Sequence, residues 1–119
     1  MLNARPDPDF PKLAKKSWPG AVTLVFPAKQ ILHKACYQKG YVAIRVDGDA
    51  ETRRMAKSCG GLMVASSLNR KGKAVQPLIL QTKYRWHRHL AAVIPSQQQP
   101  LGTASKLFKV TRHKVKQLR

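Results

Sequence analysis

The sequence predicts one α/β domain. Three short apolar runs, at 21–26, 41–46 and 62–65, have the composition of buried strands. Helical patterns at 50–58 and 78–90 alternate with these runs, which is typical of an α/β sheet. At 119 residues, the chain is long enough for one compact core and too short for two.

The N-terminal part is predicted to contain an irregular lead-in, a helix and a strand. The lead-in, Met1 to Pro8, mixes Pro, Asp and Asn with few apolar residues. Residues 10–16 form a short helix pattern that ends before Trp18-Pro19-Gly20, because the residue before a proline is disfavoured in the α region. The apolar run 21–26, ended by Pro27, then predicts a strand buried on both faces.

The middle of the chain predicts a strand at 41–46 followed by a capped helix. Asp49 is a suitable N-cap for a helix over 50–58. Glu51 in its first turn and Lys57 in its last turn complement the helix dipole. Gly60-Gly61 would close the helix.

The C-terminal half predicts a third buried strand at 62–65, which runs into a polar turn at 66–72. Polar loops after apolar strands are where α/β sheets place ligand groups. A helix is predicted over 78–90, then a last short strand at 106–110. The rest of the chain, up to Arg119, is a basic tail.

The charge of the chain indicates a polyanionic partner. Lys and Arg number 23 against five Asp and Glu, giving a net charge of +18, and every carboxylate precedes residue 52. Repulsion among these positive charges opposes compaction unless an anion neutralises them. Nucleic acid is therefore the first partner to expect. The scarcity of carboxylates also argues against catalysis by paired carboxylates and against a Mg²⁺ site made of several carboxylates.

Cysteine usage and hydropathy predict a cytoplasmic protein without membrane contact. The two cysteines, Cys36 and Cys59, are expected to be reduced, since no secretory signal precedes the first proline. No apolar run reaches the roughly 18 residues that a transmembrane helix needs.

No metal site or cysteine nucleophile is predicted. His33-x-x-Cys36 and His87-x-His89 contain possible metal ligands. The same spacing suits a short helix with Cys36 as an apolar filler, and two solvated histidines in a basic helix. A Cys-His enzyme would also need an orienting group that this acid-poor chain hardly offers.

The segment 83–89 interleaves aromatic and cationic residues, a composition that can stack on bases and pair with phosphates. Alternatively, its aromatic residues pack inward and its cations form a solvated face. Because no Asp or Glu follows residue 51, polyanion binding is favoured over a merely solvated face. The residues predicted to bind RNA are Lys83, Arg85, Trp86 and Arg88, together with Arg112, Lys114 and Lys116 of the tail.

Several segments, taken in order, resemble the Sua5/YrdC/YwlC family of threonylcarbamoyl-adenylate synthases. Residues 18–25 resemble the family's WPGPLTLV segment, 41–46 its TVAVRVP strand and 64–72 its ATSANLSG loop. Residues 103–108 resemble its PST(I/V)VD segment, and the final Leu118-Arg119 its closing LR(x)G.

This resemblance implies a twisted, open, mixed sheet with flanking helices. Residues 12–119 would correspond to the C-terminal two-thirds of the family domain, and 1–11 to a lead-in. The N-terminal part of the family domain, with its KxR motif, has no counterpart here, so a truncated domain is expected. Its open sheet edge would be covered by a homodimer or a partner chain.

Members of the family condense L-threonine, bicarbonate and ATP to threonylcarbamoyl-adenylate for tRNA modification. The resemblance implies ATP contacts at Tyr41, Ser67, Asn69 and Arg119, with Mg²⁺ as a candidate companion of ATP. It implies threonine contacts at Arg45 and Ser105. No catalytic residue is carried over, because the KxR motif is missing, and enzymatic activity is left open.

Three alternatives therefore stand: a synthase-like protein that binds RNA through a basic face, a catalytically inactive RNA-binding or ribosome-associated module, and a small basic domain with chance motif matches. Three departures bear on this choice: Tyr41 replaces a threonine, Asp47 and Asp49 replace a proline and a histidine, and Leu68 replaces a small residue. Convergence of Arg45, Ser67, Asn69 and Ser105 would favour a working site. A cleft filled by Tyr41 or Leu68 would argue against it.

Overall fold

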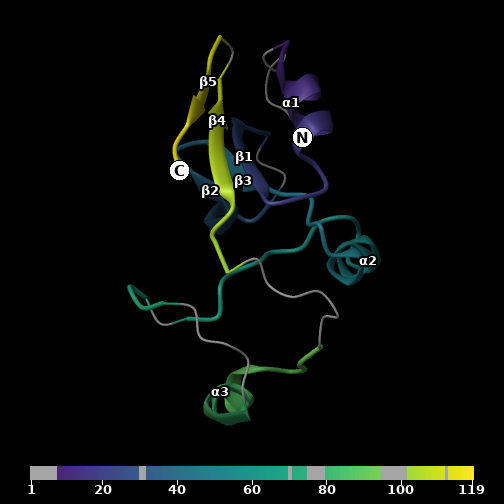
Figure 1. Cartoon of the computed structure of the whole chain (residues 1–119), viewed down its shortest axis with the longest axis vertical. Helices are drawn as coiled ribbons and strands as arrows, with labels where there is room; N and C mark the ends of the chain where they lie inside the picture. Colours follow the sequence, from purple (N-terminus) through teal and green to yellow (C-terminus); the bar gives the residue numbers. More distant parts are fainter. Residues whose placement is uncertain (1–7, 30–31, 70, 75–79, 95–101, 112) are drawn as a thin grey trace.

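The fold is an open five-stranded mixed sheet with flanking helices (Figure 1). The computed structural model describes residues 8–29, 32–69, 71–74, 80–94, 102–111 and 113–119. Its elements are α1 (Phe10–Ser17), β1 (Val22–Pro27), the 3₁₀ helix η1 (Lys34–Cys36), β2 (Tyr37–Gln38), β3 (Tyr41–Ile44), α2 (Ala50–Ser58), α3 (Leu80–Trp86), the 3₁₀ helix η2 (His87–His89), β4 (Lys106–Val110) and β5 (Val115–Gln117). The predicted α/β class is confirmed.

Strand β1 lies at the centre of the sheet, whose order is β2-β3-β1-β4-β5. It pairs antiparallel with β3 and parallel with β4, so that Leu24 lies opposite both Ile44 and Phe108. The core gathers around Leu24 and Phe26, with Val42 from β3 and Val110 from β4. Alternate residues of a strand point to opposite faces, so this core lies on one side of the sheet.

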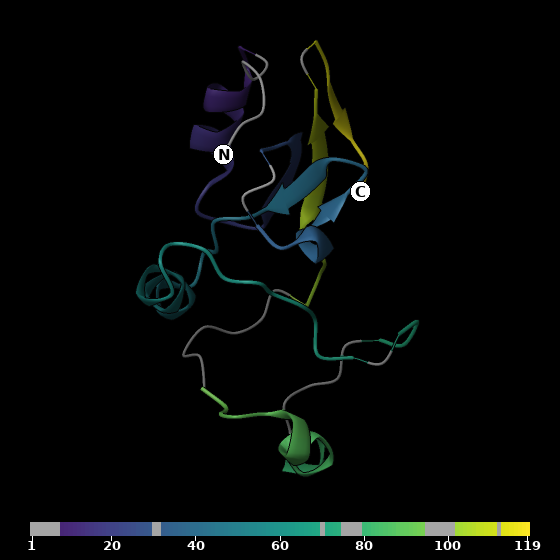
Figure 2. The same ribbon diagram turned by 180° about the vertical axis from the view of Figure 1, so that it is seen from behind.

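Helix α1 covers the core side of the sheet, as its position beside β1 shows in both ribbon views (Figures 1 and 2). Phe10 of α1 meets Phe26 edge-on, with 5.2 Å between ring centroids, and meets Trp18 at 6.4 Å. The Trp18 indole Nε1 donates a hydrogen bond to the Val22 carbonyl at 2.8 Å. Apolar packing and this bond fix the helix against the start of β1.

The second face of the sheet is more open, which corrects the prediction that β1 is buried on both faces. Thr23 and Val25 of β1 are half-buried and Ala43 of β3 is exposed. The apolar run of β1 predicted two covered faces, but its buried residues, Leu24 and Phe26, both point to the α1 side. The open face is where polar side chains can meet a ligand.

Helix α2 begins and ends as predicted. The Asp49 side chain accepts hydrogen bonds from the Thr52 N–H at 2.9 Å and from the Thr52 hydroxyl at 2.7 Å. At the other end Gly60 has φ +82°, and the Gly61 N–H donates to the Ala56 carbonyl at 2.9 Å. This is a Schellman ending, which a residue with a side chain would adopt only with strain.

Replacing Asp49 with alanine should lower the free energy of unfolding by about 1 kcal/mol, because the first turn of α2 loses its cap. Urea unfolding followed by circular dichroism measures this change. Asp49→Asn keeps an oxygen acceptor and should cost clearly less. Equal losses in the two variants would show that the cap contributes nothing and that only the charge matters.

The prediction of a third buried strand at 62–65 is wrong. The segment belongs to no described strand, and Val64 is 82% exposed. Its apolar composition predicts a strand only if a neighbouring strand is free to pair with it. The free edges of this open sheet belong to β2 and β5, but the segment runs past the end of the sheet and pairs with neither (Figures 1 and 2).

Two short strands were missed and one predicted helix is shorter than expected. β2 has only two residues, too few for a sequence pattern. β5 lies in the segment that was read as a basic tail; it pairs antiparallel with β4, with Val115 opposite Val110.

The helix predicted at 78–90 is confirmed as α3 and η2, while 78–79 lie outside the described residues. No helix in the described part of the chain is long and apolar enough to cross a bilayer.

Candidate functional site

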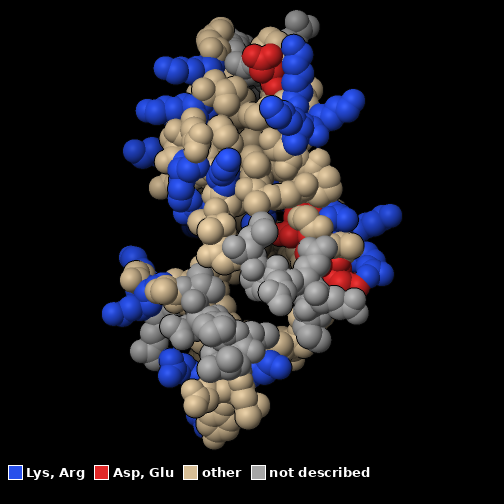
Figure 3. All heavy atoms as spheres, viewed as in Figure 1, with Lys and Arg blue, Asp and Glu red and all other residues tan. Residues whose placement is uncertain are grey.

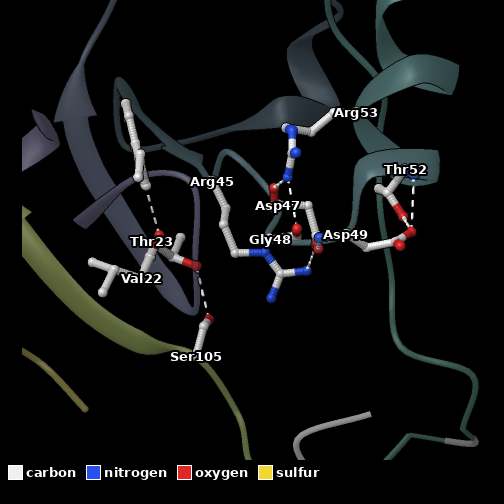
Figure 4. A network of polar contacts seen from close by, with 10 residues as sticks. Val22, Thr23, Arg45, Asp47, Gly48, Asp49, Thr52, Arg53 and Ser105 are labelled. Atoms are coloured by element: carbon white, nitrogen blue, oxygen red, sulfur yellow. Dashed lines mark hydrogen bonds and ion pairs between the residues drawn. The ribbon is translucent and has the colours of Figure 1, made fainter. Parts of the chain in front are cut away.

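Three polar side chains, from β1 and from the ends of its two neighbouring strands, lie at one end of the sheet (Figure 4). Arg45 directly follows β3, Ser105 directly precedes β4, and Thr23 lies in β1 between them. The Thr23 Oγ1 and Ser105 Oγ atoms are 2.8 Å apart. Because β3 runs antiparallel and β4 parallel to β1, the C-terminal end of β3 and the N-terminal end of β4 meet here. We call Thr23, Arg45 and Ser105 the polar corner.

The Arg45 guanidinium is paired with the Asp47 carboxylate. Asp47 is held in turn by the Asp49 N–H, which donates to Asp47 Oδ1 at 3.0 Å. Arg53 of α2 donates to the carbonyls of Asp47 and Gly48, both at 2.7 Å, so helix and loop are joined (Figure 4). The pair is partly exposed and so worth at most about 1 kcal/mol. A ligand carboxylate can therefore exchange with Asp47 at little cost.

The C-terminal residue Arg119 lies at this same end of the sheet. Its main-chain oxygen accepts a hydrogen bond from the Leu107 N–H at 2.9 Å, and the Leu118 N–H donates to the Leu107 carbonyl at 2.7 Å. Leu107 is two residues from Ser105. The segment predicted as a basic tail thus brings an exposed Arg119 side chain to the edge of the sheet beside the start of β4.

Ser67 and Asn69 lie in a turn that projects away from the sheet in both ribbon views (Figures 1 and 2). The Ser67 hydroxyl contacts the Asn69 side-chain oxygen, and Asn69 Nδ2 donates to the Lys73 carbonyl at 2.8 Å. Leu68 between them is half-buried. The structure does not bring these two residues to the polar corner.

Tyr41 lies at the opposite end of β3 from Arg45, in register with Pro27. The Lys109 Nζ atom sits 4.0 Å from the centroid of its ring, a cation–π contact between β3 and β4. Neither Tyr41 nor Leu68 fills the polar corner. The predicted ATP contacts are thus spread over three places: Arg119 near the corner, Tyr41 at the far end of β3, and the projecting turn.

The residues predicted to bind RNA form two separate surfaces. Lys83, Arg85 and Arg88 are exposed on α3 and η2, while Trp86 is half-buried. Lys114 and Lys116 are exposed on the β4–β5 hairpin, and Arg112 lies outside the described residues. α3 and this hairpin lie at opposite ends of a molecule whose longest extent is 47 Å (Figure 1). We call the two sets the α3 surface and the hairpin surface.

The acidic side chains drawn in Figure 3 lie near the start of α1, at the same end of the molecule as the β4–β5 hairpin, and beside α2, away from α3. Asp9 pairs with Lys12, and Glu51 pairs with Arg54. On the hairpin, Lys109 and Lys116 lie directly opposite each other. Like charges in this position repel, and an anion would relieve the repulsion.

A comparison with protein-family models identifies a family. The Sua5/YciO/YrdC model, described as "Telomere recombination", matches residues 3–119. The chain is a member of the Sua5/YrdC family. A search of curated proteins found no significant match, and neither did a search of solved structures. The match confirms the resemblance, and the open mixed sheet with flanking helices agrees with it.

The described part of this Sua5/YrdC-family chain contains no cluster of three or more His, Cys, Asp or Glu residues that could hold a metal ion. His33 and Cys36 lie one turn apart around η1, where the His33 Nδ1 atom accepts from the Ala35 N–H at 3.3 Å. Cys36 is half-buried and Cys59 is exposed, and both are free thiols.

Sequence reasoning missed three residues of these sites. Thr23 joins Ser105, and its signal was a hydroxyl in an otherwise apolar strand. Lys109 reaches Tyr41 and faces Lys116, which only strand pairing reveals. Tyr84 is 78% exposed, whereas the predicted Trp86 is half-buried. Composition alone could not tell which of the two aromatic rings points outward.

Proposed function

We propose that this chain is a threonylcarbamoyl-adenylate synthase-like protein that holds L-threonine at the polar corner, uses ATP, and binds RNA through its cationic surfaces. The observation that supports the proposal is that Arg45 and Ser105 lie at the same end of the sheet. The family resemblance assigns both residues to threonine, although they come from segments far apart in the sequence.

The chemistry of the polar corner suits an amino acid. A guanidinium binds a carboxylate through two parallel hydrogen bonds, and Arg45 already binds one such group in Asp47. Threonine would displace Asp47 and place its carboxylate on Arg45. The hydroxyls of Ser105 and Thr23 can donate to and accept from the polar groups of the ligand.

ATP would approach the same end of the sheet. Arg119 supplies a cation there for phosphate charge. Ser67 and Asn69, assigned to ATP by the resemblance, would contact the same nucleotide only if their turn moved towards the sheet. Tyr41 would contact it only by leaving Lys109.

Titration calorimetry with L-threonine, in the presence of ATP, tests the proposal. Arg45→Ala should weaken threonine binding by about tenfold or more, because a charged hydrogen bond is typically worth 1.5–3 kcal/mol. Arg54→Ala is the matched control: it also removes an arginine that pairs with a carboxylate, but on α2. Only the Arg45 variant should lose affinity.

Equal affinities in the two variants, or no threonine binding by the wild type, would contradict the proposed site. Where threonine binds, threonine-dependent release of pyrophosphate from ATP then tests for turnover. Binding without turnover would leave a ligand-binding relative of the synthases.

A second function, a catalytically inactive RNA-binding module, is favoured by one observation. Ser67 and Asn69 lie in a turn that projects away from the polar corner, so the predicted nucleotide contacts are not assembled. RNA binding that persists without ATP or threonine binding would select this alternative.

A further inference from the structure

The outermost aromatic side chain of α3 is part of a stacked ring pair. Tyr84 is 78% exposed, and its ring stacks on that of His87, with 5.3 Å between centroids and 29° between planes. The two residues are three apart, so they share one side of the helical segment. The His87 Nδ1 atom lies within hydrogen-bonding distance of the Tyr84 carbonyl, which orients the imidazole. The pair presents a flat π surface to the outside.

Cations lie next to this ring pair in the sequence, and no carboxylate follows Glu51 in the chain. Lys83 and Arg85 flank Tyr84 in the sequence, Arg88 follows His87, and all three are exposed. Leu80, one turn before Tyr84, is 83% exposed and adds apolar area on the same side. Flat rings for stacking beside cations for phosphates are what single-stranded nucleic acids require.

The observations favour one occupant over the alternatives. A second copy of the chain would bring another net charge of +18 against this surface. An RNA duplex would offer phosphates to the cations, but its bases are stacked on each other and would leave the Tyr84 ring without a partner. An unpaired base satisfies both the rings and the cations.

We propose that the α3 surface binds single-stranded RNA by stacking an unpaired base on Tyr84. His87 supports the ring from behind, and Lys83, Arg85 and Arg88 contact the flanking phosphates. This inference rests on the RNA-binding part of the proposed function. It adds the strandedness of the RNA and a stacking residue outside the polar corner.

The test compares the full chain and its variants by fluorescence anisotropy at one fixed salt concentration. The probes are a labelled oligouridylate of about 16 nucleotides and an RNA duplex of about 16 base pairs. Tyr84→Leu should weaken oligouridylate binding roughly 5- to 150-fold, the range for one lost base–aromatic stack. Duplex binding should be unchanged. Tyr84→Phe keeps a stacking ring and should retain the wild-type affinity for both probes.

Lys83→Gln serves as a charge control and should weaken both probes alike. Wild-type preference for the oligouridylate, lost in Tyr84→Leu and kept in Tyr84→Phe, supports the inference. Equal binding of both probes, or an unchanged Tyr84→Leu, overturns it and leaves RNA binding by charge alone. Failure of the wild type to bind either probe overturns the RNA-binding part of the proposed function as well. Tighter binding to phosphatidylserine vesicles than to RNA, with the same Tyr84 dependence, overturns it in favour of a lipid surface.

Discussion

Replacing Leu24 with alanine is expected to lower the free energy of unfolding by roughly 3 kcal/mol, within the usual range for leucine in a core. Leu24 is fully buried in the central strand, and it lies opposite residues of both neighbouring strands. Its removal leaves a cavity where the main contacts of the small core meet. For a domain of this size such a loss is a large part of the total stability. Urea unfolding, followed by circular dichroism, measures the change.

The next residue provides the matched control. Val25 belongs to the same strand but points to the more open face and is half-buried. Val25→Ala should therefore cost clearly less than Leu24→Ala. Equal losses would mean that the open face is covered in solution, for example by a second copy or a partner chain.

Raising the salt concentration from about 50 to about 200 mM is expected to weaken binding to a long single-stranded RNA by roughly 300-fold. The estimate assumes six phosphate contacts. Each contributes about 0.7 to the slope of the logarithm of the binding constant against the logarithm of the salt concentration. The six cations would be Lys83, Arg85 and Arg88 of the α3 surface and Lys109, Lys114 and Lys116 of the hairpin. Measuring affinity at several salt concentrations gives this slope directly.

Two double variants show which surface contacts the RNA. Lys83→Gln/Arg88→Gln and Lys109→Gln/Lys116→Gln should each reduce the slope by about 1.4 if both surfaces take part. The 47 Å length of the molecule means that the RNA must be long enough to reach both. Lys12→Gln, which removes a cation paired with Asp9, should leave the slope nearly unchanged. A slope unaffected by either double variant would contradict RNA binding at these surfaces.

The elements that sequence reasoning predicted are those whose signals are local. Helix α2 was predicted from Asp49 before it and Gly60-Gly61 after it, and both act as expected because capping involves only neighbouring residues. β1 and β3 were predicted because runs of apolar, β-branched residues favour strands wherever a sheet forms. Family membership followed from ordered motifs, and the family match over residues 3–119 confirms it.

The failures came from partners that the sequence does not display. Residues 62–65 have the composition of a strand, but a strand also needs a partner alongside it, and this segment pairs with none of the five described strands. β5 looks like a basic tail because only Val115 in it is apolar, yet pairing with β4 holds it in the sheet.

The sequence by itself determined the charge, the α/β class, the caps of α2 and the motifs of the family, since each depends on composition or on residues close in the chain. Only the tertiary structure decided that Arg45 and Ser105 share one end of the sheet, because their meeting depends on strand order and direction. It also decided that Asp47 forms an ion pair with Arg45 and that the RNA-binding candidates divide into two surfaces. Strand pairing and the burial of one face of the sheet decide which side chains far apart in the sequence come together. No local sequence pattern encodes strand pairing or the choice of the buried face.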